Sequence, residues 1–307
     1  MQSPYVSVLP LFPPPLRGAL QKLPPDRQAV VEEIRLRVGA PLCVVMPSGA
    51  WPVDPGRPVS CEDLEMILEA ATQGSIHAMP DFTHAGFVTV KGGHRLGLCG
   101  AVVSQGGRVS ALRHPSSLCL RLARSIYGAA DSLLPQLMRG KHFCHTLILS
   151  PPGLGKTTLL RDLIRQVSDG GSHGAPCRVS LVDERGEVAG CYQGQPQLPV
   201  GAHTDVLDGC PKAEGVIWML RGMGPQVLAM DEITAPEDVR ALQNAAGCGV
   251  VLLATAHANC LADLVRRPLY RILPQLFDKA VLIRLRGGRR FYEVHDFAQK
   301  TNRGCSS

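Results

Sequence analysis

The stretch HTLILSPPGLGKTTLLRDLIRQV, residues 145–167, decides the fold. Its apolar start (145–150) predicts a buried strand, and the residues after 157 place their apolar side chains on one stripe of an amphipathic helix. Between them lies SPPGLGKT (150–157), a loop with two glycines and a lysine. A strand, a glycine-rich loop and a helix in this order form the context of a P-loop, whose backbone N–H groups bind phosphate. The stretch therefore predicts a nucleotide site.

The residues of this loop have separate expected roles. Gly153 and Gly155 let the backbone curl closely around the phosphates, Lys156 places a positive charge on the β and γ oxygens, and the Thr157 hydroxyl binds Mg²⁺. Ser150 replaces the usual first glycine at a position that tolerates small residues. The alternative is a chance Gly/Pro turn before a helix. The residues expected to bind ATP here are Ser150, Pro151, Pro152, Gly153, Leu154, Gly155, Lys156, Thr157 and Thr158.

Two further apolar runs each end in an Asp-Glu pair. In QVLAMDE (226–232), Asp231 is expected to hold Mg²⁺ through its waters and Glu232 to polarise the attacking water. SLVDERGE (180–187) offers Asp183 and Glu184 as a second candidate pair. A fourth run ends at His257, which could sense the γ-phosphate through a hydrogen bond. The alternatives are helix caps or solvated carboxylates for the acids and a structural role for the histidine.

The apolar runs also predict the architecture. Fully apolar strands at 145–150, 178–184, 226–232, 249–256 and 280–286, several of them separated by helices, indicate an α/β domain over 140–307. Its sheet is expected to be mostly parallel, with helices on both faces. A smaller α+β domain is expected over 1–139, with a proline-rich start (1–25) that is loosely ordered or docks on a partner.

Local signals predict the elements of the first domain. They indicate a strand at 41–46, a capping box of Ser60 and Asp63 before a helix, a hairpin at Gly92-Gly93 and a turn at Gly106-Gly107. Residues 129–139 are predicted to form a helix that leads to the domain boundary near Gly140. In SLCLRLAR (117–124) the alternation places Arg121 on the face opposite the leucines.

Composition excludes several classes of protein. The chain of 307 residues has a formal charge of +6, divided as +3 (13 basic and 10 acidic residues) in 1–139 and +3 (19 and 16) in 140–307. This even spread and the 5% of aromatic residues speak against a nucleic-acid-binding surface. Eleven cysteines without a C-x-x-C pair favour reduced thiols in a cytosolic protein over a zinc site. No apolar run approaches the length that spans a bilayer.

The order of these motifs resembles the secretion ATPases of type II and type IV systems, which carry an Asp box after the P-loop and a His box after the metal strand. FVTVKGGHRLGLCG (87–100), HTDVLDGCPKAEG (203–215) and MLRGMGPQVLAMDEI (219–233) are more specifically similar to the stage III sporulation protein AA family. The resemblance places Asp183 and Glu184 on the Asp box and His257 on the His box. It raises Glu184 to equal rank with Glu232 as the residue that activates water.

This resemblance implies a RecA-type P-loop core and a Mg²⁺-dependent ATPase that acts as a hexameric motor on the cytoplasmic, mother-cell side. Other subunits of the mother cell–forespore channel complex would hold it at the membrane, and no nucleic acid is expected as a partner. The alternatives are a nucleotide-switched nucleic-acid-binding protein and an ATP-binding structural subunit without turnover. The resemblance also implies that Arg121 and Arg124 contact phosphate from the first domain; the alternative is ordinary surface arginines.

Two motifs of the resemblance have no chemistry that the residues themselves dictate. KGGHR (91–95) is expected to be structural, with Gly92-Gly93 forming its turn. TDVLDGCPKAEG (204–215) is too polar for a core and could form a loop over the nucleotide or a subunit contact. Arg221, just beyond it, could be an arginine finger or an ordinary exposed arginine.

Overall fold

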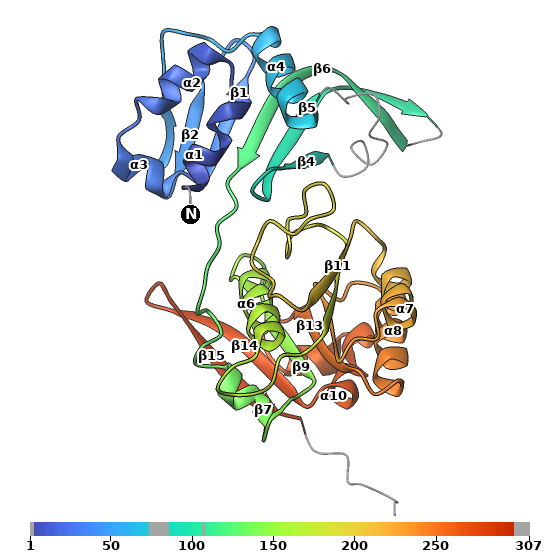
Figure 1. Ribbon diagram of the computed structural model, residues 1–307. Coiled ribbons are helices and arrows are strands. Elements are labelled where there is room, and N and C mark those ends of the chain that lie inside the picture. The colour runs from blue at the N-terminus through green and yellow to red at the C-terminus, as the bar shows by residue number, and fades with distance from the viewer. Residues whose placement is uncertain (1–2, 74–85, 106–107, 298–307) are drawn as a thin grey trace, which may run out of the picture. The chain divides into compact units, whose positions relative to one another are not determined.

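The computed structural model describes residues 3–73, 86–105 and 108–297. The predicted turn at Gly106-Gly107 lies outside these residues. The chain divides into two compact units: Met1–Arg124 with Gly190–Gln197, and Ser125–Ala189 with Leu198–Ser307 (Figure 1). The first unit thus ends at Arg124, before the expected boundary near Gly140, and includes a segment from the second half of the chain. No helix among the described residues is both long and apolar enough to cross a membrane.

The first unit is a six-stranded antiparallel sheet with helices on one face (Figure 1). The strand order is β3-β2-β1-β6-β5-β4. The expected strand at 41–46, the helix capped by Ser60 and Asp63, and the hairpin at Gly92-Gly93 are all confirmed. The strands are β1 (Glu33–Arg37), β2 (Cys43–Met46), β3 (Gly49–Pro52), β4 (Phe87–Val90), β5 (His94–Gln105) and β6 (Arg108–Arg121), and the main helix is α4 (Cys61–Thr72).

The proline-rich start is ordered, contrary to the expectation of a loose segment. It forms α1 (Pro4–Val8), a 3₁₀ turn (Leu9–Leu11), α2 (Pro14–Gln21) and α3 (Pro25–Val30). The prolines of these elements occupy first-turn positions, where a missing N–H costs nothing. Five large side chains of this region are buried in the core of the unit: Tyr5, Val8, Phe12, Leu16 and Leu20.

The motif KGGHR has the expected structural role. Gly92 and Gly93 have φ of +91° and +76°, which glycine adopts readily, and form the turn between β4 and β5. His94 is 2% exposed and accepts a hydrogen bond at Nδ1 from the Ala123 N–H. Its Nε2 lies 2.9 Å from Ser7 Oγ. Burial lowers the pKa of His94 to about 4, so a neutral imidazole joins three segments of this unit.

The second unit is built on a seven-stranded sheet of order β11-β10-β12-β13-β9-β14-β15. All neighbouring pairs are parallel except β14 and β15. The P-loop strand β9 and the acidic strand β12 are separated by β13. The strands are β9 (Thr146–Ser150), β10 (Val179–Asp183), β11 (Thr204–Asp208), β12 (Val227–Met230), β13 (Val251–His257), β14 (Lys279–Arg286) and β15 (Arg289–Asp296).

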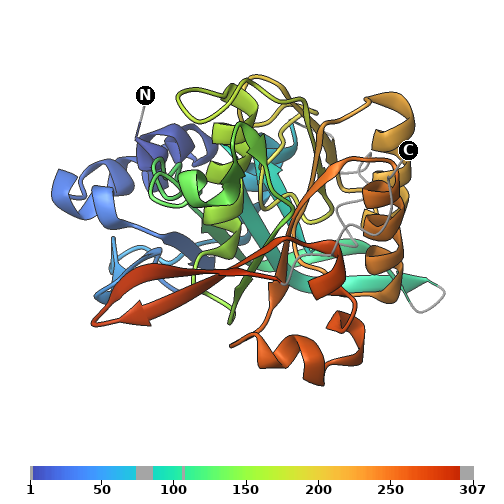
Figure 2. The same ribbon diagram turned by 90° about the horizontal axis from the view of Figure 1, so that it is seen from below.

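Helices cover both faces of this sheet, as predicted. The helices α7 (Lys212–Gly222), α8 (Pro236–Gly247) and α10 (Leu273–Leu276) share a buried cluster with alternate residues of β9, β12 and β13. The helix α6 (Lys156–Asp169) lies against β9, β10 and β13. Figure 2 shows α6 and the segment around residue 270 on opposite sides of the red strands β14 and β15. A further short helix is α9 (Ala262–Arg266), followed by a 3₁₀ turn (Pro268–Tyr270).

Two sequence expectations for this unit are wrong. Residues 129–139 form turns and a 3₁₀ helix (Leu134–Leu137) instead of a continuous helix, because Asp162 binds the Ala130 N–H and Pro135 follows Leu134. The stretch 204–215 contains the edge strand β11 and the start of α7 rather than a polar loop, while its role in a subunit contact stays a prediction. The antiparallel hairpin β7 (Met138–Arg139) and β8 (His142–Phe143) lies at the predicted domain boundary, well inside this unit.

Candidate nucleotide site

The P-loop has the geometry that its sequence predicts. It connects the end of β9 to the start of α6, and Gly153 and Gly155 have φ of +77° and +93°, a region that side chains other than glycine rarely adopt. Lys156 is the first residue of α6 and is 7% exposed. The loop thus presents a helix N-terminus, flexible main chain and one buried cation, which together suit a phosphate.

Lys156 is connected to Glu232 through His257. Its ammonium donates to the carbonyl oxygens of Ser150 and Pro151, each at 3.2 Å, and to His257 Nδ1 at 2.9 Å. Because His257 accepts at Nδ1, its proton is on Nε2, which donates to Glu232 Oε1 at 2.8 Å. Burial lowers the pKa of Lys156, and the charges of Glu232 and Asp231 oppose that shift. The predicted P-loop, His257 and Glu232 therefore form one hydrogen-bonded chain.

Asp231 faces two hydroxyl groups. Thr157 Oγ1 donates to Oδ2 at 3.0 Å and Thr255 Oγ1 donates to Oδ1 at 2.7 Å. Burial raises the pKa of Asp231, and these two hydrogen bonds oppose the shift. The pairing of a Thr157 hydroxyl with a carboxylate fits Mg²⁺, which prefers oxygen ligands and retains several waters. Thr157 and Asp231 are the residues that would hold the ion.

Asp183 has a different environment from Asp231, although each lies at the carboxyl end of one of two neighbouring strands, β10 and β12. It is 1% exposed, and its two oxygens accept hydrogen bonds from the N–H groups of Glu187, Val188 and Ala189. Arg161 of α6 holds the same loop through the carbonyls of Glu187 and Val188. Burial raises the pKa of Asp183 to about 6 against the effect of these donors. Asp183 therefore organises the loop.

Glu184 is also engaged in a contact of its own. Lys212, the lysine of the DGCPKAEG motif, is 6% exposed and forms an ion pair with Glu184. Glu232 instead pairs with His257 and with Arg185, whose Nη1 lies 3.2 Å from Oε2. Glu232 also has φ of +48°, a left-handed conformation that is uncommon outside glycine and concentrates at functional sites.

A pocket of about 400 Å³ opens beside the P-loop. It includes Gly155, Thr158 and Leu159 of the loop and of α6. Arg290 of β15 reaches this site, because a Cβ placed on Gly155 would lie 3.5 Å from its guanidinium carbon. The other walls are the segment 126–129 and the hairpin of β14 and β15, which contribute Ile126, Tyr127, Gly128, Ala129, Leu285, Gly288 and Tyr292.

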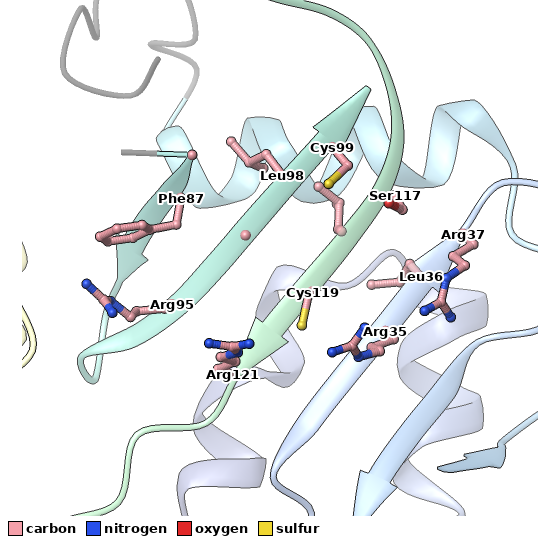
Figure 3. A pocket seen from close by; sticks show the side chains of 13 residues that line it. Arg35, Leu36, Arg37, Phe87, Arg95, Leu98, Cys99, Ser117, Cys119 and Arg121 are labelled. Carbon is pink, nitrogen blue, oxygen red and sulfur yellow. The ribbon is translucent and has the colours of Figure 1, made fainter. Parts of the chain in front are cut away.

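The arginines suggested by resemblance lie in the first unit. Arg121 is on the open face of the sheet, as the alternation predicts, and pairs with Glu33 at 3.0 Å. It lines a pocket of about 390 Å³ together with Arg35, Arg37 and Arg95 (Figure 3). Arg124 donates to the Val31 carbonyl at 2.9 Å, which gives it a structural contact. The contact of either residue with phosphate stays a prediction. Arg221 is exposed on α7, and its role as a finger also stays a prediction.

Several residues of this site were given no role in the sequence analysis. Lys212 pairs with Glu184, Arg185 pairs with Glu232 and Arg290 lies next to Gly155, and two of these three partners are far away along the chain. Thr255 was not predicted because it lies within an apolar run. A single threonine two residues before His257 could have indicated a polar contact at this end of the strand. Its Oγ1 accepts from the Glu232 N–H at 2.8 Å while it donates to Asp231, so one hydroxyl orients both residues.

Comparisons with known proteins agree with this geometry. Stage III sporulation protein AA of Bacillus subtilis (strain 168) is 38% identical over 289 residues, which are 93% of each chain. The crystal structure of the pilus retraction motor PilT with bound ADP is similar with a TM-score of 0.64 at 17% identity, over 93% of this chain and 82% of that one. The Legionella pneumophila ATPase DotB is similar with a TM-score of 0.57 at 15% identity, over 88% and 78%. These two structures support the P-loop secretion-ATPase fold. The family described as sporulation stage III, protein AA matches residues 8–292, and the chain belongs to that family.

Proposed function

We propose that this protein is a Mg²⁺-dependent ATPase in which Glu232 activates the attacking water. The observation that carries the proposal is the hydrogen-bonded chain from Lys156 through His257 to Glu232, at 2.9 and 2.8 Å. A phosphate in the P-loop competes with His257 for the Lys156 ammonium. The state of the phosphate site is thereby linked to the orientation of the Glu232 carboxylate.

The roles of the other residues follow from their contacts. The backbone of the loop and Lys156 would hold the β and γ phosphates, while Thr157 and Asp231 would hold Mg²⁺, which neutralises the charge that develops on the phosphate oxygens. Glu232 would accept a proton from water placed in line with the γ-phosphate. Catalysis would then consist mainly of positioning and electrostatic stabilisation.

The pocket beside the P-loop would receive the nucleoside. Tyr127, Ile126 and Leu285 are large side chains that are 50%, 44% and 53% exposed around it. A flat base can cover such apolar surface, and the aromatic ring of Tyr127 can stack on it. Arg290, next to Gly155, would then lie between the base and the phosphates.

The test is phosphate release by the wild-type protein and two variants. Lys156→Ala should abolish nucleotide binding and release. Glu232→Gln should still bind ADP with a Kd within about twofold of wild type and hydrolyse ATP at least about 100-fold more slowly, the usual contribution of a general base. Equal rates for wild type and Lys156→Ala would refute the proposal.

A second measurement separates the two parts of the ligand. Tyr127→Ala should weaken the binding of ATP but leave the binding of inorganic triphosphate unchanged, whereas Lys156→Ala should weaken both. Trp218→Ala, which removes an exposed aromatic side chain of α7, is the matched control. If Tyr127→Ala and Trp218→Ala bind ATP equally well, the nucleoside does not occupy this pocket.

We further propose that the protein works as a homo-oligomeric motor, a hexamer, with channel subunits as partners on the mother-cell side of the membrane. The support is its family and the fold that it shares with two proteins named as an ATPase and a retraction motor. Light scattering with a non-hydrolysable nucleotide should give a mass well above 32.9 kDa. A persistent monomer would contradict the oligomer, and ATP binding without any phosphate release would favour a structural channel subunit.

A further inference from the structure

The motif DGCPKAEG places a lysine where lysines are rarely found. Lys212 is the first residue of α7 and is 6% exposed, although lysine is among the residues least often buried. A buried ammonium is retained only when opposite charges compensate for its lost hydration. The charged partners of Lys212 therefore indicate what this motif does.

Those partners come from the segments that follow the two acidic strands. The ammonium of Lys212 is paired with Glu184, which follows β10, and lies 3.9 Å from Oδ2 of Asp238. Asp238 is 4% exposed and accepts hydrogen bonds from the N–H groups of Thr234 and Ala235, in the segment that follows β12. Lys212 thus connects Glu184, directly after β10, with the first turn of α8, the helix that follows β12.

A glutamate follows each of these two strands at an equivalent position, Glu184 after β10 and Glu232 after β12. Val182 pairs with Met230 in parallel register, so Glu184 and Glu232 each come two residues after a paired position. Neighbouring strands are only about 4.8 Å apart. An ionised carboxylate that faces a γ-phosphate repels it, whichever of the two strand ends it follows. Glu184 pairs with the buried ammonium of Lys212, whereas Glu232 pairs with His257 and with the exposed Arg185.

We propose that Lys212 is a positioning residue of the nucleotide site. It holds Glu184 in an ion pair and thereby leaves Glu232 as the single carboxylate that faces the attacking water. The inference rests on the proposed ATPase function and assigns the Asp-box glutamate a role opposite to that of a catalytic base. Lys212 itself touches neither nucleotide nor water in this scheme.

The test is a double-mutant cycle on phosphate release. Lys212→Met removes the charge at nearly constant volume and should lower kcat at least about tenfold, while the Kd for ADP stays within about twofold, because the residue acts through Glu184. Glu184→Gln should keep kcat within about threefold of wild type. The double variant should recover most of the kcat lost in Lys212→Met, since an uncharged glutamine side chain at position 184 needs no countercharge.

Two further variants separate positioning from a merely structural role. Lys279→Met is the matched control, because Lys279 forms an ion pair with Asp296 in the same unit, away from the site. It should lower stability slightly and leave kcat unchanged. Lys212→Arg should restore part of the activity, since it restores the charge. A double variant as slow as Lys212→Met, or a Lys212→Met variant as fast as Lys279→Met, would overturn the proposal.

The experiment remains decisive if Lys212→Met does not fold. Glu184→Gln is then compared with Glu232→Gln, and a loss in Glu184→Gln as large as that in Glu232→Gln would overturn the assignment. Failure of the ATPase proposal has a different signature, because the wild type would then release no phosphate that depends on Lys156. In that case, a melting temperature that rises when Glu184→Gln is added to Lys212→Met still reports the ion pair.

Discussion

The dipeptide Asp-Glu occurs twice at the same edge of one sheet, and the two copies have different environments. After β10, Asp183 is bound by three backbone N–H groups and Glu184 by Lys212. After β12, Asp231 faces two threonine hydroxyls and Glu232 faces a histidine and an arginine. Backbone donors are fixed and cannot be exchanged for a ligand, whereas hydroxyls can turn toward a metal. The partners, not the residue types, therefore distinguish the two pairs, and in the proposed function only the pair after β12 takes part in the chemistry.

The largest expected effect concerns hydrolysis. Asp231→Asn should reduce Mg²⁺-dependent phosphate release by about 10²–10³-fold, because it removes a carboxylate that would hold the ion against the phosphates. The free energy of unfolding should change by less than about 1 kcal/mol, since Asn can still accept one of the two threonine hydrogen bonds. Phosphate release and chemical denaturation measure the two quantities on the same sample.

Removal of the aspartate carboxylate from the other pair, after β10, should lower the free energy of unfolding. Asp183→Ala leaves two buried N–H groups and one partly buried N–H group without an acceptor and should lower the free energy of unfolding by about 3 kcal/mol or more. Where the variant remains folded at low temperature, its rate per folded molecule should stay within about tenfold of wild type. A stable Asp183→Ala variant that hydrolyses as slowly as Asp231→Asn would abolish the distinction between the pairs.

The dependence of stability on pH gives a smaller contrast. The pKa of Asp183 is raised to about 6, mainly by burial, so the folded protein binds its proton more tightly than the unfolded chain does. The stability that this proton adds to the folded protein is fully present below the ordinary pKa of aspartate and is lost as the pH rises through about 6. Between pH 4 and 6.5 the free energy of unfolding should therefore fall on the order of 1–3 kcal/mol more in wild type than in Asp183→Asn. The free energy of unfolding is measured by urea denaturation at each pH. If it changes equally with pH in wild type and in Asp183→Asn, Asp183 does not bind this proton.

The smallest expected effect is a gain in stability. Glu232 has φ of +48°, and a non-glycine residue in this region costs about 1 kcal/mol. Glu232→Gly should therefore raise the free energy of unfolding by about 1 kcal/mol while it abolishes hydrolysis. Glu184→Gly, at a residue without positive φ, should give no such gain and serves as the control.

The sequence predicted what depends on local pattern. The P-loop, the five apolar strands, the capped helix and the Gly92-Gly93 hairpin could all be predicted from the periodicity of apolar residues and the spacing of glycines and capping residues. The edge strands β11 and β15 were missed because each has a polar, partly exposed pattern rather than an apolar run. The helix expected at 129–139 was overridden by tertiary contacts such as the bond from the Ala130 N–H to Asp162.

The division of roles proposed for Glu184 and Glu232 could not be predicted from the sequence. Both glutamates follow an aspartate at the end of an apolar run, so their local sequences are equivalent. What separates them is Lys212, whose contact with Glu184 depends on where α7 begins relative to β10. The resemblance to secretion ATPases likewise left the two residues at equal rank.

The strand order of the second unit has a consequence for the synthesis of the protein. The pocket proposed for the nucleotide combines Tyr127 and Gly155 with Arg290 and Tyr292 of β15, which follows the other described strands of this sheet along the chain. A nascent chain that already exposes its P-loop therefore still lacks one wall of the pocket. Nucleotide can add its binding energy to folding only after nearly all of this unit has been translated, so the earlier strands must associate without help from the ligand.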